Sequence, residues 1–165
     1  MSIPYRGWTG HDTYFITAST ADKKPVLQSG RMAGLLVDVL CHYRADHKYL
    51  LHEFVVMPSH FHLLLTPEVT LERALQLIKG GFSFRARKEF GIQSQIWQTS
   101  FYDHRVRDAG EYERARNYIY QNPVKAGLVK LAEEYPYSSA SPHWESNEVP
   151  QRLKPVTSLP AKSQG

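Results

Sequence analysis

The sequence has little cysteine, no long apolar run and no secretion pattern near its first residue. Cys41 is the one cysteine among 165 residues, so a disulfide framework is excluded and a reducing compartment is indicated. No stretch approaches the roughly 18 consecutive apolar residues of a membrane span. The opening segment, MSIPYRGWTGHDTYF, lacks the apolar core and cleavage site of a signal peptide. We therefore expect a soluble, cytoplasmic protein.

The composition is ordinary for a globular domain but mildly basic. Hydrophobic residues make up 42% of the chain and charged residues 22%, with a formal net charge of +4. This charge fits a nucleic-acid partner, although many proteins without one share it. Ten tyrosines suit base stacking, a phenolic nucleophile or a well-filled core, and composition alone does not choose among these.

Hydrophobic periodicity predicts alternating strands and helices. Strands are expected at 12–20, 48–57, 60–66 and 101–108, and helices at 29–47, 70–91, 109–123 and 125–134. Pro58-Ser59 forms the turn of a hairpin, and Gly80-Gly81 is a candidate break in the second helix. The helix over 109–123 should end near Asn122, because the residue before a proline disfavours the α region.

The order β-α-β-β-α-β predicts an α+β, ferredoxin-like fold (split βαβ). Its antiparallel sheet would carry helices on one face and leave the other face available for a site. We expect this domain to cover residues 1–137, including C-terminal helices. Residues 138–165 are rich in serine, proline and polar residues, which predicts an extended or disordered tail.

Two histidines in the segment VVMPSHFHLLLT are separated by a single residue. On a strand, His60 and His62 project from the same face and Phe61 from the other. A surface or partly buried pair of imidazoles is the simplest interpretation. Two neutral imidazoles on one face also suit a divalent metal ion, which then needs a further ligand from elsewhere in the chain.

The segment RNYIYQNPVKAGLV offers that further ligand. Tyr118 and Asn122 are four residues apart on the predicted helix and therefore share one face, whereas Tyr120 faces elsewhere. The amide oxygen of Asn122 could complete the metal site, with the Tyr118 hydroxyl directed at whatever the metal binds. Spacing alone also allows Tyr118 to be an ordinary core tyrosine.

Together, MPSHFHLLL and YIYQNPVKAGLV resemble the single-tyrosine HUH transposases, which include the IS200-like transposases, and more closely their REP-associated branch. The segment IWQTSFYDHRVRD is also similar, and the likeness covers residues 10 to 137. It implies that His60 and His62 are metal ligands and that Tyr118 is the nucleophile. Asn122 stands where related transposases place a glutamine ligand. The implied cofactor is Mg²⁺ or Mn²⁺.

The resemblance further implies a metal-dependent single-stranded DNA endonuclease and strand transferase. It would cleave at or near REP-type hairpins through a 5′-phosphotyrosine intermediate, associated with a bacterial nucleoid. Monomers and homodimers both occur among such transposases. Basic residues suited to DNA phosphates are Lys79, Arg85, Arg87, Lys88 and Lys125.

Three alternatives are considered. A domesticated relative could bind hairpin DNA without cutting it, although binding alone would not require His60, His62 and Tyr118. An unrelated metal enzyme with this fold would lack DNA affinity. A histidine-triad hydrolase is excluded, because Leu64 occupies the position of its third alternating histidine.

Overall fold

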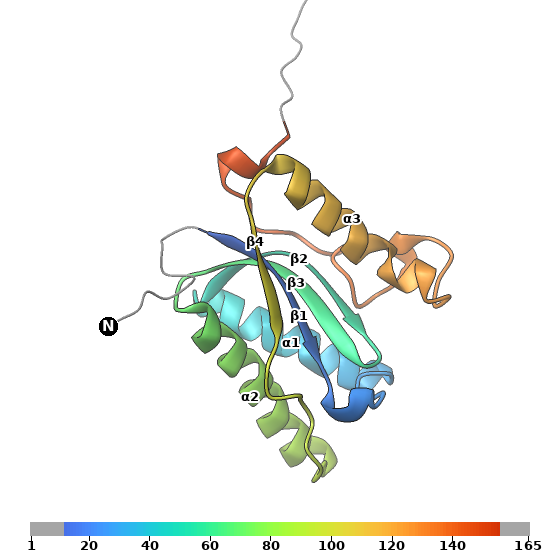
Figure 1. The fold of residues 1–165 in the computed structure, drawn as a ribbon. Coiled ribbons are helices and arrows are strands. Elements are labelled where there is room, and N and C mark those ends of the chain that lie inside the picture. Colours follow the sequence, from blue (N-terminus) through green and yellow to red (C-terminus); the bar gives the residue numbers. More distant parts are fainter. Residues whose placement is uncertain (1–11, 156–165) are drawn as a thin grey trace, which may run out of the picture.

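The structure is a computed structural model that describes residues 12–155, and its centre is a four-stranded antiparallel sheet (Figure 1). The strands are β1 (Thr13–Ser19), β2 (Tyr49–Met57), β3 (His60–Pro67) and β4 (Tyr102–Val106). Their order across the sheet is β2-β3-β1-β4. This is the order of a split βαβ unit, so the ferredoxin-like prediction is confirmed.

Helices cover both faces of this sheet. Helices α1 (Gly30–Ala45) and α2 (Leu71–Phe90) lie on one face, and α3 (Ala109–Lys125) lies on the other (Figure 1). Each helix begins at a side chain that accepts a hydrogen bond from the first turn; these are Ser29, Thr70 and Asp108. None of the helices within residues 12–155 is both long and apolar enough to cross a membrane.

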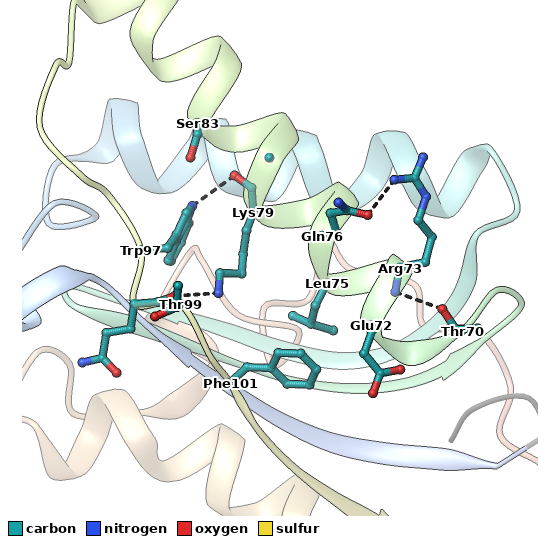
Figure 2. A pocket seen from close by; sticks show the side chains of 12 residues that line it. Thr70, Glu72, Arg73, Leu75, Gln76, Lys79, Ser83, Trp97, Thr99 and Phe101 are labelled. Atoms are coloured by element: carbon teal, nitrogen blue, oxygen red, sulfur yellow. Dashed lines mark hydrogen bonds between the residues drawn. The ribbon is translucent and has the colours of Figure 1, made fainter. Parts of the chain in front are cut away.

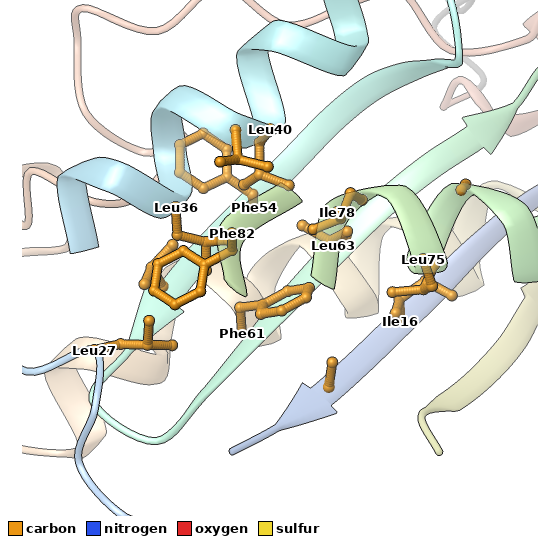
Figure 3. Close-up of a cluster of buried hydrophobic side chains, with 14 of the residues drawn as sticks. Ile16, Leu27, Leu36, Leu40, Phe54, Phe61, Leu63, Leu75, Ile78 and Phe82 are labelled. Carbon is orange, nitrogen blue, oxygen red and sulfur yellow. The ribbon is translucent and has the colours of Figure 1, made fainter. Parts of the chain in front are cut away.

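The alternation of side chains along β3 gives the sheet one apolar face and one mixed face, which carries both polar and apolar residues. Phe61, Leu63 and Leu65 are buried against α1 and α2, within the main core (Figure 3). His60 and His62 project from the opposite side, toward α3. The hairpin turn at 58–59 thus fixes which residues of β3 face the core and which face α3.

Three helix predictions are wrong in detail. Helix α2 is continuous through Gly80-Gly81, and Gly81 serves packing instead: a Cβ there would lie 2.9 Å from Cε2 of Tyr43. The predicted helix over 125–134 is absent, because Gly127 takes a left-handed φ of 76° and only a 3-10 turn, η2 (Ala132–Glu134), follows.

Helix α3 also extends beyond its predicted end at Asn122. It continues through Pro123 to Lys125. The proline removes only one donor from the last turn, and the amide of Ala126 still donates to the carbonyl of Asn122 at 3.0 Å. Asn122 is therefore inside the helix, one turn after Tyr118.

The chain after α3 returns along the free edge of β2. Val56 donates to the carbonyl of Tyr137 at 2.8 Å, and Ser139 donates to that of Phe54 at 2.9 Å. Leu153, in the 3-10 turn η3 (Gln151–Leu153), is buried beneath α3. The sequence predicts an extended or disordered segment here; up to residue 155 the chain passes through several turns and covers the edge of β2. Residues 156–165 of the predicted tail lie outside the described residues.

Candidate active site

The histidine pair occupies the start of β3, on the side of the sheet that faces α3. The ring centroids of His60 and His62 are 4.9 Å apart. His60 is partly exposed, whereas His62 is 3% exposed. The two imidazoles therefore share one face, as the strand alternation predicted.

His62 is held in a fixed orientation. Its Nδ1 lies 2.8 Å from Oγ1 of Thr17, the residue opposite it on β1, and its ring stacks on Phe15 at 5.4 Å between centroids. Burial, together with the nearby His60, lowers the pKa of His62 to about 3, so the ring is neutral at pH 7. A proton on Nδ1, shared with Thr17, leaves the Nε2 lone pair available.

The Nε2 atom of His62 is buried and has no hydrogen-bond partner among the described residues. A buried polar atom without a partner is costly, so such an atom in a native site calls for a ligand. Neutral imidazole nitrogen is a common ligand for divalent metals, and an Nδ1 bond to a neighbouring side chain is the usual way to orient it. This observation favours a metal at the histidine pair.

Tyr118, on α3, packs against the ring of His62. Its ring centroid is 5.1 Å from that of His62 and 5.9 Å from that of Phe15, and its side chain is 49% exposed. Ile119, the next residue, is fully buried under α3. Tyr120 faces elsewhere, as predicted, and donates to Oε1 of Glu53 at 2.8 Å. Of these two tyrosines, Tyr118 is the one beside the histidines.

Asn122 and Lys23 surround His60. Burial lowers the pKa of the His60 imidazole, the positive charge of Lys23 lowers it further, and a side-chain hydrogen bond with Asn122 opposes both. The carboxamide of Asn122 is thus within hydrogen-bond reach of a candidate ligand. Lys23 was missed in the sequence; it follows β1 in a left-handed turn (φ 53°), and no pattern links it to His60.

The available donors fit a small divalent ion with open positions. No group of three His, Cys, Asp or Glu side chains that could hold a metal exists within residues 12–155. The side chains that could hold a metal here are His60 and His62, with the amide of Asn122, and they would leave positions for water or substrate oxygens. Such a mixed set suits Mn²⁺ and, with more oxygen ligands, Mg²⁺.

Four of the five basic residues predicted to bind DNA lie on α2, across the sheet from Tyr118 (Figure 1). Lys79 donates to the carbonyl of Gln98 at 2.7 Å, and burial lowers the pKa of its ammonium (Figure 2). Arg85 pairs with Glu89 at 3.2 Å, and Arg87 donates to two loop carbonyls. Lys79 and Arg87 thus fasten the loop after α2, which sequence spacing did not show.

The other two predicted DNA-binding residues, Lys88 and Lys125, have no such hydrogen bonds or ion pairs among the described residues. Lys88 sits 5.9 Å from the centre of the Phe84 ring, on the exposed side of α2. Lys125 is exposed in the last turn of α3, three residues after Asn122, and so lies on the face of α3 that carries Asn122. Lys125 therefore lies on the opposite side of the sheet from the four basic residues of α2 (Figure 1).

A split βαβ sheet with a histidine pair on a central strand and a tyrosine on the facing helix defines the class of single-tyrosine HUH transposases. The family model described as "Transposase IS200 like" matches residues 11–122, a range that includes His60, His62, Tyr118 and Asn122. The chain therefore belongs to the IS200-like transposase family, and the family predicted from the motifs is confirmed.

Relatives place it near the REP-associated branch. It is 30% identical over 158 residues to a putative REP-associated tyrosine transposase of Haemophilus influenzae, covering 84% of this chain and 85% of that protein. It is 28% identical over 148 residues to the REP-associated tyrosine transposase of Escherichia coli, covering 84% and 82%.

Solved structures agree. A REP-associated tyrosine transposase bound to a REP hairpin superposes with a TM-score of 0.68 at 26% identity, covering 84% of this chain and 82% of that one. A putative transposase from Deinococcus radiodurans shares the fold, with a TM-score of 0.52 at 22% identity, over 71% of this chain and 95% of its own.

Proposed function

We propose that this transposase is a metal-dependent single-stranded DNA endonuclease and strand transferase that acts at or near REP-type hairpins. The observation that carries this proposal is the buried, partnerless Nε2 of His62 beside the half-exposed Tyr118. Together they supply a metal-ligand atom and an accessible nucleophile at one point. The hairpin as substrate rests on the similar transposase bound to a REP hairpin.

Tyr118 acts as the nucleophile in this proposal. Its phenol oxygen attacks a backbone phosphorus and releases its proton, the bond from phosphorus to the 3′ oxygen breaks, and that oxygen takes up a proton. The products are a 5′-phosphotyrosine and a free 3′-hydroxyl. Because the covalent bond retains the phosphodiester energy, attack by another 3′-hydroxyl can rejoin strands without a nucleotide cofactor.

His60, His62 and Asn122 would hold Mg²⁺ or Mn²⁺ in this proposal. A bound divalent ion stabilises negative charge on the phosphate oxygens. Thr17 and Phe15 keep the His62 ring in place for this task. Lys125 is the predicted basic residue that lies on the same side and is proposed to contact the DNA backbone.

A covalent trapping experiment tests the proposal. The protein is incubated with labelled single-stranded hairpin DNA of varied sequence and Mg²⁺ or Mn²⁺, then resolved on a denaturing gel. A protein–DNA band is expected that disappears with EDTA and in Tyr118→Phe. Tyr120→Phe is the matched control, since Tyr120 bonds to Glu53 and should leave the band intact.

Two results of this experiment would contradict the proposal. If the protein bound hairpin DNA but formed no covalent band with any DNA sequence or either metal, its role would be to bind hairpins without cutting them. A band that persists in Tyr118→Phe would assign the nucleophile to another residue.

A further inference from the structure

A hollow of about 470 Å³ lies beside Tyr118, between β1, β4 and α3. This volume is within the usual range of small-ligand sites, roughly 300–1,000 Å³. His62 and Tyr118 form the side of the hollow nearest the proposed active site. Whatever fills this space is therefore next to the phosphate that Tyr118 would attack.

Aromatic rings line one side of this hollow, which we call the Tyr118 hollow. Tyr102, at the start of β4, pairs with Thr17 of β1, which in turn pairs with His62 of β3. The three side chains form one row across the sheet, so Tyr102 stands two strand spacings, about 10 Å, from His62. Tyr102 is 58% exposed, and its ring is 6.5 Å from that of Phe15.

Polar groups from α3 line the other side. Oε1 of Glu111 accepts a hydrogen bond from the amide of Arg107 at 2.8 Å and lies 3.4 Å from Nε2 of His104. Its second oxygen, Oε2, makes no hydrogen bond with any described residue. The guanidinium of Arg114, one turn later and exposed, likewise makes no hydrogen bond or ion pair within residues 12–155. Oε2 of Glu111, an acceptor, and the guanidinium of Arg114, a donor, thus belong to side chains that line the hollow, and neither group has a hydrogen-bond partner among the described residues.

We propose that the Tyr118 hollow binds an unpaired nucleobase of the nucleotide next to the phosphate that Tyr118 attacks. This inference rests on the proposed function. An exposed aromatic ring is a stacking platform for any base, and stacking is a principal source of affinity for single strands. The carboxylate of Glu111 and the guanidinium of Arg114 read the hydrogen-bonding edge of the base and so select one base type.

A nucleobase explains the hollow better than a second phosphate would. A phosphate needs donors only, and the Glu111 carboxylate would repel it. A base presents donors and acceptors on its edge and an apolar face, which matches the carboxylate, the guanidinium and the ring of Tyr102. The hollow therefore deepens the proposed function by giving the enzyme a means of choosing where it cuts.

Selection from a random pool tests this proposal. Tyr118→Phe protein, which we expect to hold DNA without forming the adduct, is mixed with DNA hairpins whose single-stranded flanks are randomised on both sides. Retained molecules are sequenced. We expect one flank position to be enriched in one base at least about fivefold, the low end of the discrimination that hydrogen bonds to one base edge provide.

Variants of Tyr102 and Arg114 test whether that enrichment arises at the Tyr118 hollow. Adding Tyr102→Ala to the Tyr118→Phe protein should abolish the enrichment, and Tyr102→Phe, which keeps the ring, should retain it. Arg114→Ala changes an exposed helix position and should also weaken the base preference, independently of β4. An abasic site at the selected position should lower affinity about tenfold in the Tyr118→Phe protein but not when Tyr102→Ala is added.

The two proposals fail differently. Hairpins retained with an unchanged base preference in Tyr102→Ala and Arg114→Ala would overturn the base site and leave the transposase chemistry standing. If Tyr118→Phe protein retains no hairpin at all, the proposed function itself is overturned.

Discussion

The two faces of the sheet are built from neighbouring residues yet have opposite characters. Toward α1 and α2, the side chains of β1 and β3 are apolar and fully buried, as for Ile16 and Phe61. Toward α3, the same two strands present Thr17, His60 and His62. One face is apolar and buried, whereas the other combines a smaller apolar cluster, which includes Leu64 and Ile119, with exposed or unpartnered polar groups. Chemistry becomes possible on that second face.

The division depends on the two-residue period of a strand, because moving the register of β3 by one residue would bury the histidines and expose Phe61. The tight hairpin between β2 and β3 fixes that register, with Met57 opposite His60. Adjacent residues of one strand thus allow direct tests of the difference between the faces.

The largest expected effect is on the apolar face. Phe61→Ala should lower the free energy of unfolding by about 3–5 kcal/mol, because it removes a fully buried ring packed against Trp97 and α2. Urea denaturation followed by tryptophan fluorescence measures this loss. A change of under about 1 kcal/mol would mean that this face is not the main source of stability.

His60→Ala, one residue away on the other face, should show the reverse pattern. Because it removes a proposed metal ligand that is partly exposed, DNA cleavage should fall by about 100-fold or more. Its unfolding free energy should change far less than that of Phe61→Ala. Single-turnover cleavage in Mn²⁺ and urea denaturation of the same protein give both values, and undiminished cleavage would remove His60 from the site.

Thr17→Val should weaken the site without removing a ligand. Valine has nearly the same shape as threonine but cannot hydrogen-bond to Nδ1 of His62, which lies 2.8 Å away. Loss of such a supporting contact costs about 10–100-fold in metal affinity. Titration with Mn²⁺ followed by its electron paramagnetic resonance signal checks this, with Thr13→Val, on the same face but away from the pair, as the control.

His52 should make the polar side of the sheet sensitive to acid. Burial lowers the pKa of its imidazole below the ordinary 6.5, and both ring nitrogens have partners, Asn147 and Thr66. The unfolded chain therefore binds a proton that the folded one does not as pH falls below 6.5. The stabilising contribution is complete above that pH and declines below it, by up to about 1.4 kcal/mol per pH unit.

Comparing His52→Gln with the unaltered protein isolates this contribution. The difference between their unfolding free energies should change between pH 7 and pH 5, as measured by urea denaturation at each pH. Parallel pH curves for the two proteins would show that His52 is not the group that titrates.

The smallest effect concerns the cations on the two sides. Lys125→Ala should weaken hairpin binding a few-fold. It should also make the slope of the logarithm of the binding constant against the logarithm of the salt concentration shallower by about 0.7–0.9, as expected for one lost phosphate contact. Lys88→Ala, across the sheet on α2, should change neither. Fluorescence anisotropy over a series of salt concentrations measures both, and equal losses in the two variants would extend the DNA footprint across both faces.

The sequence predicted much of this arrangement because the relevant signals are local. Strand alternation placed His60 and His62 together, and helical spacing placed Tyr118 and Asn122 on one face. The contributions of Thr17, Lys23 and Tyr102 were missed, since each depends on strand pairing or on a turn far from the histidines in sequence. The basic residues of α2 were grouped with the site because composition gives no information about which face of the sheet a helix covers.

The course of the chain after Ser138 was also beyond local signals. Its serines and prolines are typical of exposed, extended segments, yet Ser139 donates to the buried carboxylate of Glu53 at 2.7 Å. Tyr120 of α3 bonds to the same oxygen. That contact joins β2, α3 and the returning chain, and residues so far apart in sequence carry no pattern that would reveal it.

In the proposed function, the face of the sheet toward α3 cleaves DNA covalently through Tyr118. The most direct measurement is mass spectrometry of the protease-digested covalent complex formed with hairpin DNA and Mn²⁺. We predict a nucleotide attached through its 5′ phosphate to Tyr118, and no such peptide when His62→Ala protein is used. A nucleotide attached to any other residue would exclude Tyr118 as the nucleophile, and an adduct of equal yield without His62 would exclude a role for the histidine pair in cleavage.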